Sequence, residues 1–121
     1  MYGLIIITNK IEFSNNIKDY FQSLSPINFN NIKLFTYGVD VSDFKSINQD
    51  IVNVINLHEK VEYFFMISDF GTSSNISKEI NVINEKIHWC KGSIIENGYL
   101  LYKLVNGGAP IESIMLSINE N

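Results

Sequence analysis

The chain of 121 residues is long enough for one domain with a single buried core, and its 45% hydrophobic fraction excludes an intrinsically disordered protein. Its formal charge of −4, with nine basic residues that are all Lys, argues against nucleic acid as a partner, because nucleic acid is normally bound by a clustered basic surface. No apolar stretch approaches the roughly 20 residues of a membrane span, and no basic region precedes the first apolar run. We therefore expect a cytoplasmic protein that does not insert into membranes.

Strands and amphipathic helices are expected to alternate from the start of the chain. The run 4–7 is apolar throughout, as in a strand covered by helices on both faces of a parallel sheet. A helix should follow and end near Ser25, because apolar residues recur at helical spacing: Phe13, Ile17, Phe21 and Leu24. A second strand is predicted over 32–37 and a loop over 38–45. Residues 46–49, Ser-Ile-Asn-Gln, fit a capping box that opens a helix with the buried stripe Ile47, Ile51, Val54 and Ile55.

The second half of the chain continues the alternation with a third strand over 63–67. Ser73, Ser74 or Asn75 would cap the next helix, whose apolar stripe is Ile76, Ile80, Ile83 and Ile87. A short fourth strand is predicted at 88–90, and a helix over 99–105 that is closed by Asn106, Gly107 and Gly108. Pro110 should lie near the first turn of a last helix.

This alternation predicts one α/β domain over residues 1–121, with an open, mainly parallel sheet of four to five strands flanked by helices. Ligands of such sheets bind outside the carboxyl ends of the strands. The candidate site residues are therefore those at strand ends: Thr8, Asn9, Lys10, Gly38, Asp40, Asp69, Gly71, Thr72 and the segment from Ser93 to Glu96. We expect no cofactor and no metal ion. Cys90 is the single cysteine, which precludes an internal disulfide and favours a small buried hydrophobic residue.

Three segments resemble one known family, in matching order and spacing over nearly the whole chain. They are residues 2–13 (YGLIIITNKIEF), 64–72 (FFMISDFGT) and 92–98 (GSIIENG). The family is the phosphoryl-transfer subunit of phosphoenolpyruvate-dependent dihydroxyacetone kinase, a relative of the mannose-type IIA domains of the sugar phosphotransferase system. The resemblance implies the mannose-type IIA fold, a phosphorylated His at position 9 and an orienting carboxylate at Asp69.

The resemblance also implies partners for the chain. Family members accept phosphate from the small carrier HPr, pass it to ADP on a nucleotide-binding kinase subunit, and commonly form homodimers. The residues that would contact phosphate or partner by this resemblance are Thr8, Lys10, Gly38, Gly71, Thr72, Ser93 and Glu96.

Asn9 stands where the family has its phosphorylated His. A neutral imidazole offers an in-plane lone pair, whereas the amide nitrogen of Asn is conjugated with its carbonyl and is no nucleophile. The resemblance therefore predicts a degenerate or regulatory copy that binds family partners without carrying phosphate.

Two other functions stay open at this stage. One is an active phosphotransferase with another acceptor, either Asp69, because carboxylates form acyl phosphates, or His88. The other is a non-enzymatic dimerisation or interaction module. Structural roles compete for the same residues: Asp69 as the cap of the following turn, His88 packed inside a strand, His58 at a helix end, and Thr72 at a helix start.

Overall fold

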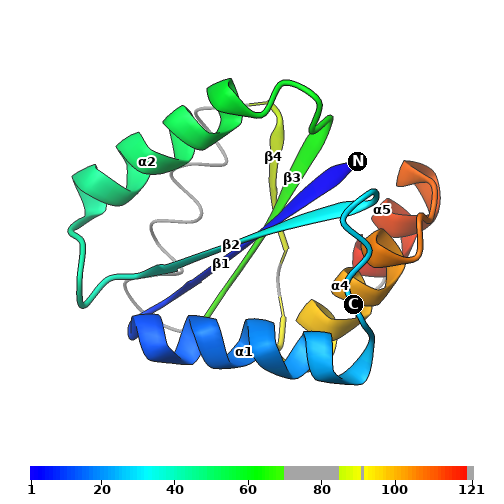
Figure 1. Cartoon of the computed structure of the whole chain (residues 1–121), viewed down its shortest axis with the longest axis horizontal. Helices are drawn as coiled ribbons and strands as arrows, with labels where there is room; N and C mark the ends of the chain where they lie inside the picture. The colour runs from blue at the N-terminus through cyan, green and yellow to red at the C-terminus, as the bar shows by residue number, and fades with distance from the viewer. Residues whose placement is uncertain (70–84, 91, 120–121) are drawn as a thin grey trace.

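The computed structural model describes residues 1–69, 85–90 and 92–119, and within these residues four parallel strands form one sheet (Figure 1). The strands are β1 (Tyr2–Thr8), β2 (Ile32–Gly38), β3 (Tyr63–Ser68) and β4 (Ile87–Trp89). The helices are α1 (Ile11–Leu24), α2 (Phe44–Leu57), α4 (Glu96–Asn106) and α5 (Ile111–Asn119). The predicted open, parallel α/β fold is confirmed.

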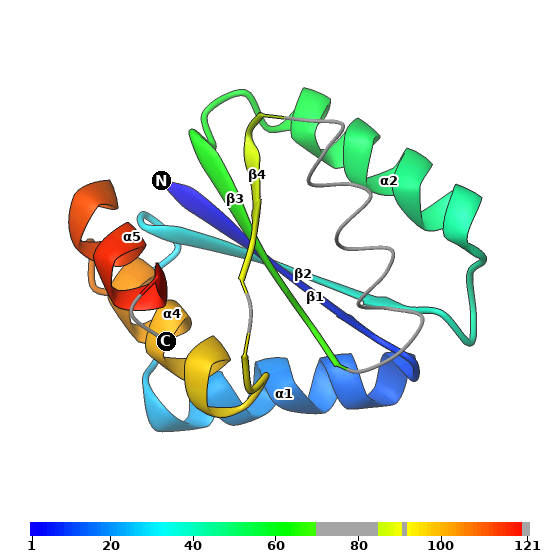
Figure 2. The same cartoon turned by 180° about the vertical axis from the view of Figure 1, so that it is seen from behind.

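The strand order β2-β1-β3-β4 places β1 inside the sheet, with β2 on one side and β3 on the other (Figure 2). The chain leaves β1 for β2 in one direction and then returns to build β3 and β4 in the other. The direction of winding therefore reverses between β1 and β3. Register aligns Thr8 with Gly38 and Ile7 with Ser68, so the carboxyl ends of β1, β2 and β3 share one edge.

The core has two layers because successive side chains of a strand point to opposite faces of the sheet. Leu4 and Ile6 of β1 pack on one face under α1, α4 and α5. Ile5 and Ile7 pack on the other face with the buried side of α2. All four of these β1 side chains have no exposed surface, which explains the uninterrupted apolar run of the sequence.

The start of α2 corrects the predicted capping box. The helix begins at Phe44, and its N-cap is Asp43, whose Oδ1 accepts the backbone N–H of Ser46 at 2.8 Å. The hydrogen bond from the backbone of Ser46 is the main cause of a lowered pKa at the Asp43 carboxyl. The predicted stripe is otherwise correct at three positions, since Ile47, Ile51 and Ile55 are buried, while Val54 is half-buried.

The buried face of α1 also differs from the prediction. Ile17 and Phe21 are buried as expected, but Phe13 and Leu24 are 40% and 50% exposed, and Ser14 is buried in their place. Further along, Ile87 lies in β4 and not at the end of a helix, and α4 begins at Glu96, three residues before the predicted start. The rest of the helix predicted from residue 76 lies outside the described residues, as do its candidate caps.

Candidate functional site

Asn9 and Asp69 meet at the edge where the parallel strands end. Asn9 follows the last residue of β1, and Asp69 follows the last residue of β3. The backbone N–H of Asn9 donates to Oδ2 of Asp69 at 3.1 Å, which links the two strand ends. The position that the resemblance gives to the phosphorylated residue and the position of its orienting carboxylate are therefore adjacent, at the point where the winding of the sheet reverses.

A buried hydroxyl pair holds the end of β1 against the start of α1. Thr8 and Ser14 have no exposed surface, and their side-chain oxygens lie 2.7 Å apart. The Ser14 hydroxyl also donates to the carbonyl oxygen of Tyr37 on β2 at 2.7 Å, and the Thr8 hydroxyl donates to that of Lys10 at 2.5 Å. Thr8, a candidate contact for phosphate, and Ser14 therefore together tie β1, β2 and α1 to one another.

Lys10, Gly38 and Asp40 surround the same turn. Lys10 is the N-cap of α1 and is exposed, while Oδ1 of Asp40 accepts the N–H of Ile11 at 2.9 Å. Gly38 is buried, and a Cβ at this position would collide with the backbone of Ile11. Glycine is therefore required here because the start of α1 passes directly against the end of β2.

The two remaining described candidates open α4. The side-chain oxygen of Ser93 accepts the N–H of Glu96 at 3.3 Å, and its carbonyl accepts the N–H of Asn97 at 2.9 Å. Glu96 is the first residue of the helix and is exposed. Gly71 and Thr72 lie outside the described residues.

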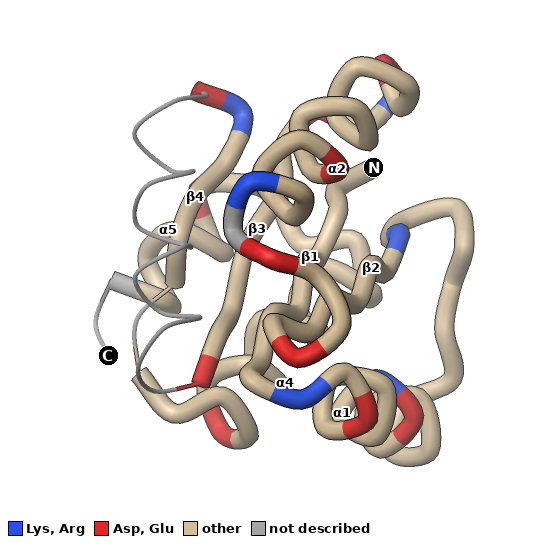
Figure 3. Tube along the Cα trace, turned by 90° about the vertical axis from the view of Figure 1, so that its left-hand side faces the viewer, with Lys and Arg blue, Asp and Glu red and all other residues tan. Residues whose placement is uncertain are grey.

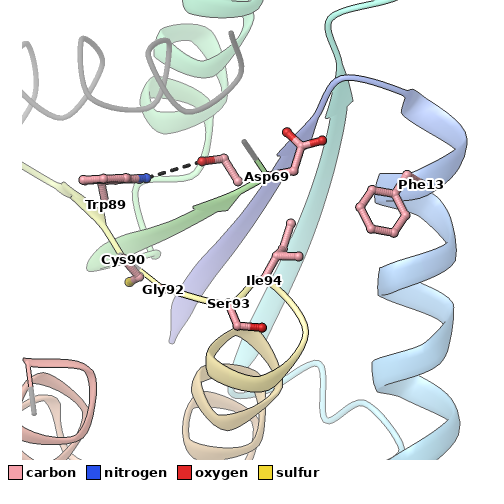
Figure 4. Close-up of a pocket in the computed structure, with 8 residues that line it drawn as sticks. Phe13, Asp69, Trp89, Cys90, Gly92, Ser93 and Ile94 are labelled. Carbon is pink, nitrogen blue, oxygen red and sulfur yellow. Dashed lines mark hydrogen bonds between the residues drawn. The ribbon is translucent and has the colours of Figure 1, made fainter. Parts of the chain in front are cut away.

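A cavity of about 640 Å³ opens beside Asp69, between the ends of β3 and β4, the start of α1 and the loop before α4 (Figure 4). Its described lining is mostly apolar: Phe13, Ser68, Asp69, Trp89, Cys90, Gly92, Ser93 and Ile94. Trp89 is half-buried, and its Nε1 donates to Oγ of Ser68 at 3.4 Å.

Of this lining, Asp69, Ser93 and Ile94 were among the predicted site positions, but the aromatic residues Phe13 and Trp89 were not. Trp89 was assigned to a strand and Phe13 to the buried face of a helix, so neither appeared as a site residue. Their positions in the chain could have indicated a place in the site. Trp89 is the last residue of β4, and Phe13 lies in the first turn of the helix that follows β1.

Neither imidazole of the chain lines this cavity. The sequence contains two histidines, and the structure describes both. His58 follows α2 at the opposite edge of the sheet, where its Nδ1 lies 2.8 Å from the carbonyl oxygen of Val54. His88 lies on β4, the outer strand of the described sheet next to β3, and is half-buried. Its ring lies 6.3 Å from that of Phe65, and burial lowers the pKa of its imidazole.

Cys90 lines the cavity with an unreactive thiol. The side chain is buried, and desolvation raises the pKa of its thiol to about 12, against an opposing hydrogen bond with the backbone of Met66. A protonated thiol is a poor nucleophile and a poor metal ligand. The described residues hold no cluster of three His, Cys, Asp or Glu side chains arranged for a metal ion.

Charged positions of both signs are interspersed over the edge that carries the strand ends (Figure 3). Among the described helices, none is long and apolar enough to cross a membrane.

Comparison with solved structures gives two similar folds. The crystal structure of the unknown-function protein EF1359 has a TM-score of 0.78 with 13% identity, over 99% of this chain and 95% of that chain. A sigma-54 interaction domain protein from Enterococcus faecalis has a TM-score of 0.76 with 8% identity, over 98% of this chain and 87% of that chain. These likenesses show the fold. No protein-family model and no curated protein matches the sequence.

Proposed function

We propose that this protein is a partner-binding relative of the phosphoryl carriers of the dihydroxyacetone kinase type, without their covalent step. The proposal is carried by one observation: Asn9 lies at the end of β1 against the carboxylate of Asp69, at the place where the resemblance calls for a phosphorylated imidazole. Both histidines of the chain lie elsewhere in the fold.

The chemistry of the site supports binding without transfer. A phosphoryl acceptor needs a lone pair that is available to attack phosphorus, and the side-chain amide of Asn9 has none on nitrogen. The carboxylate of Asp69 receives the backbone N–H of residue 9, a bond that holds the strand ends in place whatever side chain stands there. The ends of β1 and β3 thus keep a defined surface for a partner, although the nucleophilic imidazole of the family is missing.

The partners follow from the resemblance. An HPr-like carrier or a nucleotide-binding kinase subunit would cover the edge around Asn9 and Lys10, and a homodimer would present two such edges. The cytoplasm, where these partners act, is the proposed location.

The test of the chemistry is incubation with phosphoenolpyruvate, the first carrier enzyme and HPr, followed by intact-mass measurement at mildly alkaline pH, which preserves phosphohistidine. We expect the wild-type mass to stay unchanged while an active relative in the same reaction gains one phosphate. A one-phosphate increase that maps to Asp69 or His88 would replace this proposal with an active enzyme that uses another acceptor.

The Asn9→His variant tests whether the remainder of the site is intact. It restores an imidazole beside Asp69, and we expect it to gain one phosphate in the same assay, with Asn9→Gln as the unlabelled control. Binding is measured separately, by titrating HPr and the kinase subunit into isotope-labelled wild-type protein and following its amide resonances. No perturbation by either protein would contradict the partner-binding role.

A second candidate function, an interaction module outside phosphotransfer, is favoured by apolar side chains at the surface of α1 and the segment after it. Tyr20 is 49% exposed, Leu24 50% and Phe29 72%. One structural neighbour is described as a sigma-54 interaction domain protein, which provides an example of a similar fold named for an interaction. Measurement of the molar mass in solution for wild type and for Tyr20→Lys tests self-association through this surface.

A further inference from the structure

The free edge of the sheet at β2 has a regular pattern of outward-pointing backbone groups. The strand order places β2 at one side of the sheet, and this side lies nearest the viewer in Figure 1. The N–H of Tyr2 donates to the carbonyl of Asn31 at 3.0 Å, and the N–H of Val39 donates to the carbonyl of Thr8 at 3.0 Å. Because successive residues of a strand alternate in direction, the backbone groups of odd-numbered β2 residues point to β1, and those of even-numbered residues point away from it.

Two residues in the middle of β2 present open hydrogen-bonding groups at this edge. They are Leu34 and Thr36, whose outward N–H and C=O groups have no hydrogen-bond partner among the residues that the structure describes. The open stretch is closed at both ends, because the N–H of Ile32 donates to the preceding loop at 3.2 Å and the carbonyl of Gly38 accepts from the turn that follows. An edge strand of seven residues in continuous register, without proline, can pair with a further strand.

A second copy of β2 in antiparallel orientation satisfies these open groups in a single register. In that register Leu34 faces the partner subunit's Thr36, and by symmetry Thr36 faces the partner subunit's Leu34. Facing residues of this kind exchange both of their backbone hydrogen bonds in an antiparallel pair, so every open donor and acceptor of Leu34 and Thr36 is used. The edge is therefore complementary to itself.

The same register brings opposite charges together. Side chains of odd-numbered β2 residues lie on the α2 face of the sheet, where Phe35 and Tyr37 pack. Lys33, the one charged residue of β2, therefore faces the partner subunit's Tyr37. Asp50 of α2 lies near Tyr37, since burial and then the charge of Asp50 raise the pKa of Tyr37 to about 12. Each Lys33 thus approaches an acidic group of the other copy, and no like charges of the two β2 strands face each other.

We propose that this protein forms a two-fold symmetric homodimer in which the β2 strands of two copies pair antiparallel and join the two sheets into one. Phe35 meets the partner subunit's Phe35 at the two-fold axis, as a non-hydrogen-bonded pair whose side chains are close. Two-fold dimers are the commonest closed homo-oligomers, and their interfaces are self-complementary, as this edge is. The pairing uses neither Asn9 nor Asp69, so it stands apart from the proposed function.

A disulfide tests the register directly. The Cα atoms of a non-hydrogen-bonded antiparallel pair lie about 4.5 Å apart, which a disulfide spans, whereas residues displaced by two positions lie about 7–8 Å apart. After mild oxidation we expect Phe35→Cys to form a covalent dimer in several-fold higher yield than Thr36→Cys, whose cysteines are displaced along the strands. Wild-type protein is the blank, because its single cysteine, Cys90, is buried.

An exchange of charges tests the contact between Lys33 and Asp50. In sedimentation equilibrium the wild type should approach twice the 13.9 kDa mass of one chain. Lys33→Glu should raise the Kd of the dimer at least about ten-fold, since symmetry creates two like-charge contacts with Asp50. The double variant, Lys33→Glu with Asp50→Lys, should restore most of the affinity. Tyr20→Lys, an exposed substitution on α1, is the matched control and should leave the Kd unchanged.

Hydrogen exchange provides a readout on the wild-type protein. The N–H groups of Leu34 and Thr36 are protected only in the dimer, whereas those of Phe35 and Tyr37 point to β1 in monomer and dimer alike. We therefore expect the protection of Leu34 and Thr36 to rise with protein concentration while the protection of Phe35 stays constant.

Several results would overturn this dimer. They are a monomer at millimolar concentration, a dimer with unprotected Leu34 and Thr36 amides, or a higher yield of disulfide for Thr36→Cys than for Phe35→Cys. Dissociation by Tyr20→Lys would assign the contact to α1 and overturn it as well. If Phe35→Cys fails to fold, hydrogen exchange on the wild type decides alone. The absence of HPr and kinase-subunit binding would contradict the proposed function and leave the dimer unaffected.

Discussion

Replacement of Ser14 by Ala tests whether the buried hydroxyl pair positions the edge of the sheet. The Ser14 oxygen lies 2.7 Å from both the Thr8 hydroxyl and the Tyr37 carbonyl, and the Thr8 hydroxyl also reaches the Lys10 carbonyl. Two hydroxyl protons thus serve three short contacts, so at most two of them are hydrogen bonds at one moment. Ser14 takes part in two of the three contacts, and its removal leaves Thr8 and a carbonyl facing a small void.

The magnitude follows from opposing terms. Loss of one to two hydrogen bonds in a buried place costs about 1–3 kcal/mol. The higher helix propensity of Ala returns about 0.5 kcal/mol. We expect Ser14→Ala to lower the free energy of unfolding by about 1–2 kcal/mol.

Ser23→Ala is the matched control on the same helix. Its hydroxyl donates to the carbonyl of Tyr20 at 2.6 Å, but Ser23 is exposed, so water replaces the lost bond and the free energy of unfolding should change by less than about 0.5 kcal/mol. Urea unfolding is followed by circular dichroism and by Trp89 fluorescence. Equal unfolding free energies for the two variants would refute the structural role of the Thr8 and Ser14 pair.

Three further predictions concern other parts of the fold. Gly92→Ala forces a side chain into a positive φ and against Asn97, and should destabilise the protein by about 1–3 kcal/mol in urea unfolding; an unchanged midpoint would contradict the geometry of this loop. Asn106→Ala removes a buried amide whose Oδ1 accepts the N–H of Asn28 at 2.6 Å and whose Nδ2 donates to the carbonyl of Pro26 at 2.9 Å, so the free energy of unfolding should fall by about 2–4 kcal/mol; a loss below about 1 kcal/mol would show that water replaces these bonds. Cys90 stays protonated in the fold up to a pKa of about 12 while the unfolded chain ionises near 9, so its contribution to stability is present below pH 9 and is lost as pH rises toward 12. Unfolding midpoints measured across this range should fall less steeply for Cys90→Ala, and a maleimide should label the folded wild type only after denaturant is added.

The order of strands and helices could be predicted because apolar residues recur at helical spacing in the helices and form continuous runs in the buried strands. The convergence of Asn9 and Asp69 could also be predicted, since the carboxyl ends of parallel strands meet at one edge. The start of α2 was predicted wrongly because two capping signals overlap. Asp43 and Ser46 are three residues apart, both are residue types that cap helices, and only the backbone path shows that Asp43 receives the N–H of Ser46.

The buried face of α1 could not be predicted from helical spacing alone. Hydrophobicity selects Phe13 over Ser14, but the Ser14 hydroxyl finds acceptors on β1 and β2 that no local pattern contains. A satisfied hydroxyl can be buried at little net cost, and rotation of the helix to bury it moves Phe13 toward the cavity. The same rotation of α1 therefore explains why the prediction wrongly buried Phe13 in the core and why it did not place Phe13 in the lining of the cavity.

Asp69 makes the contact on which the proposed function depends. Its carboxylate accepts the backbone N–H of Asn9, the position at which the family resemblance expects a phosphorylated imidazole. Asp69→Asn retains an acceptor for this N–H but removes the charge, so it should preserve the strand ends and any binding of HPr there. Loss of HPr binding in an Asp69→Asn variant of unchanged stability would mean that the carboxylate charge itself contacts the partner.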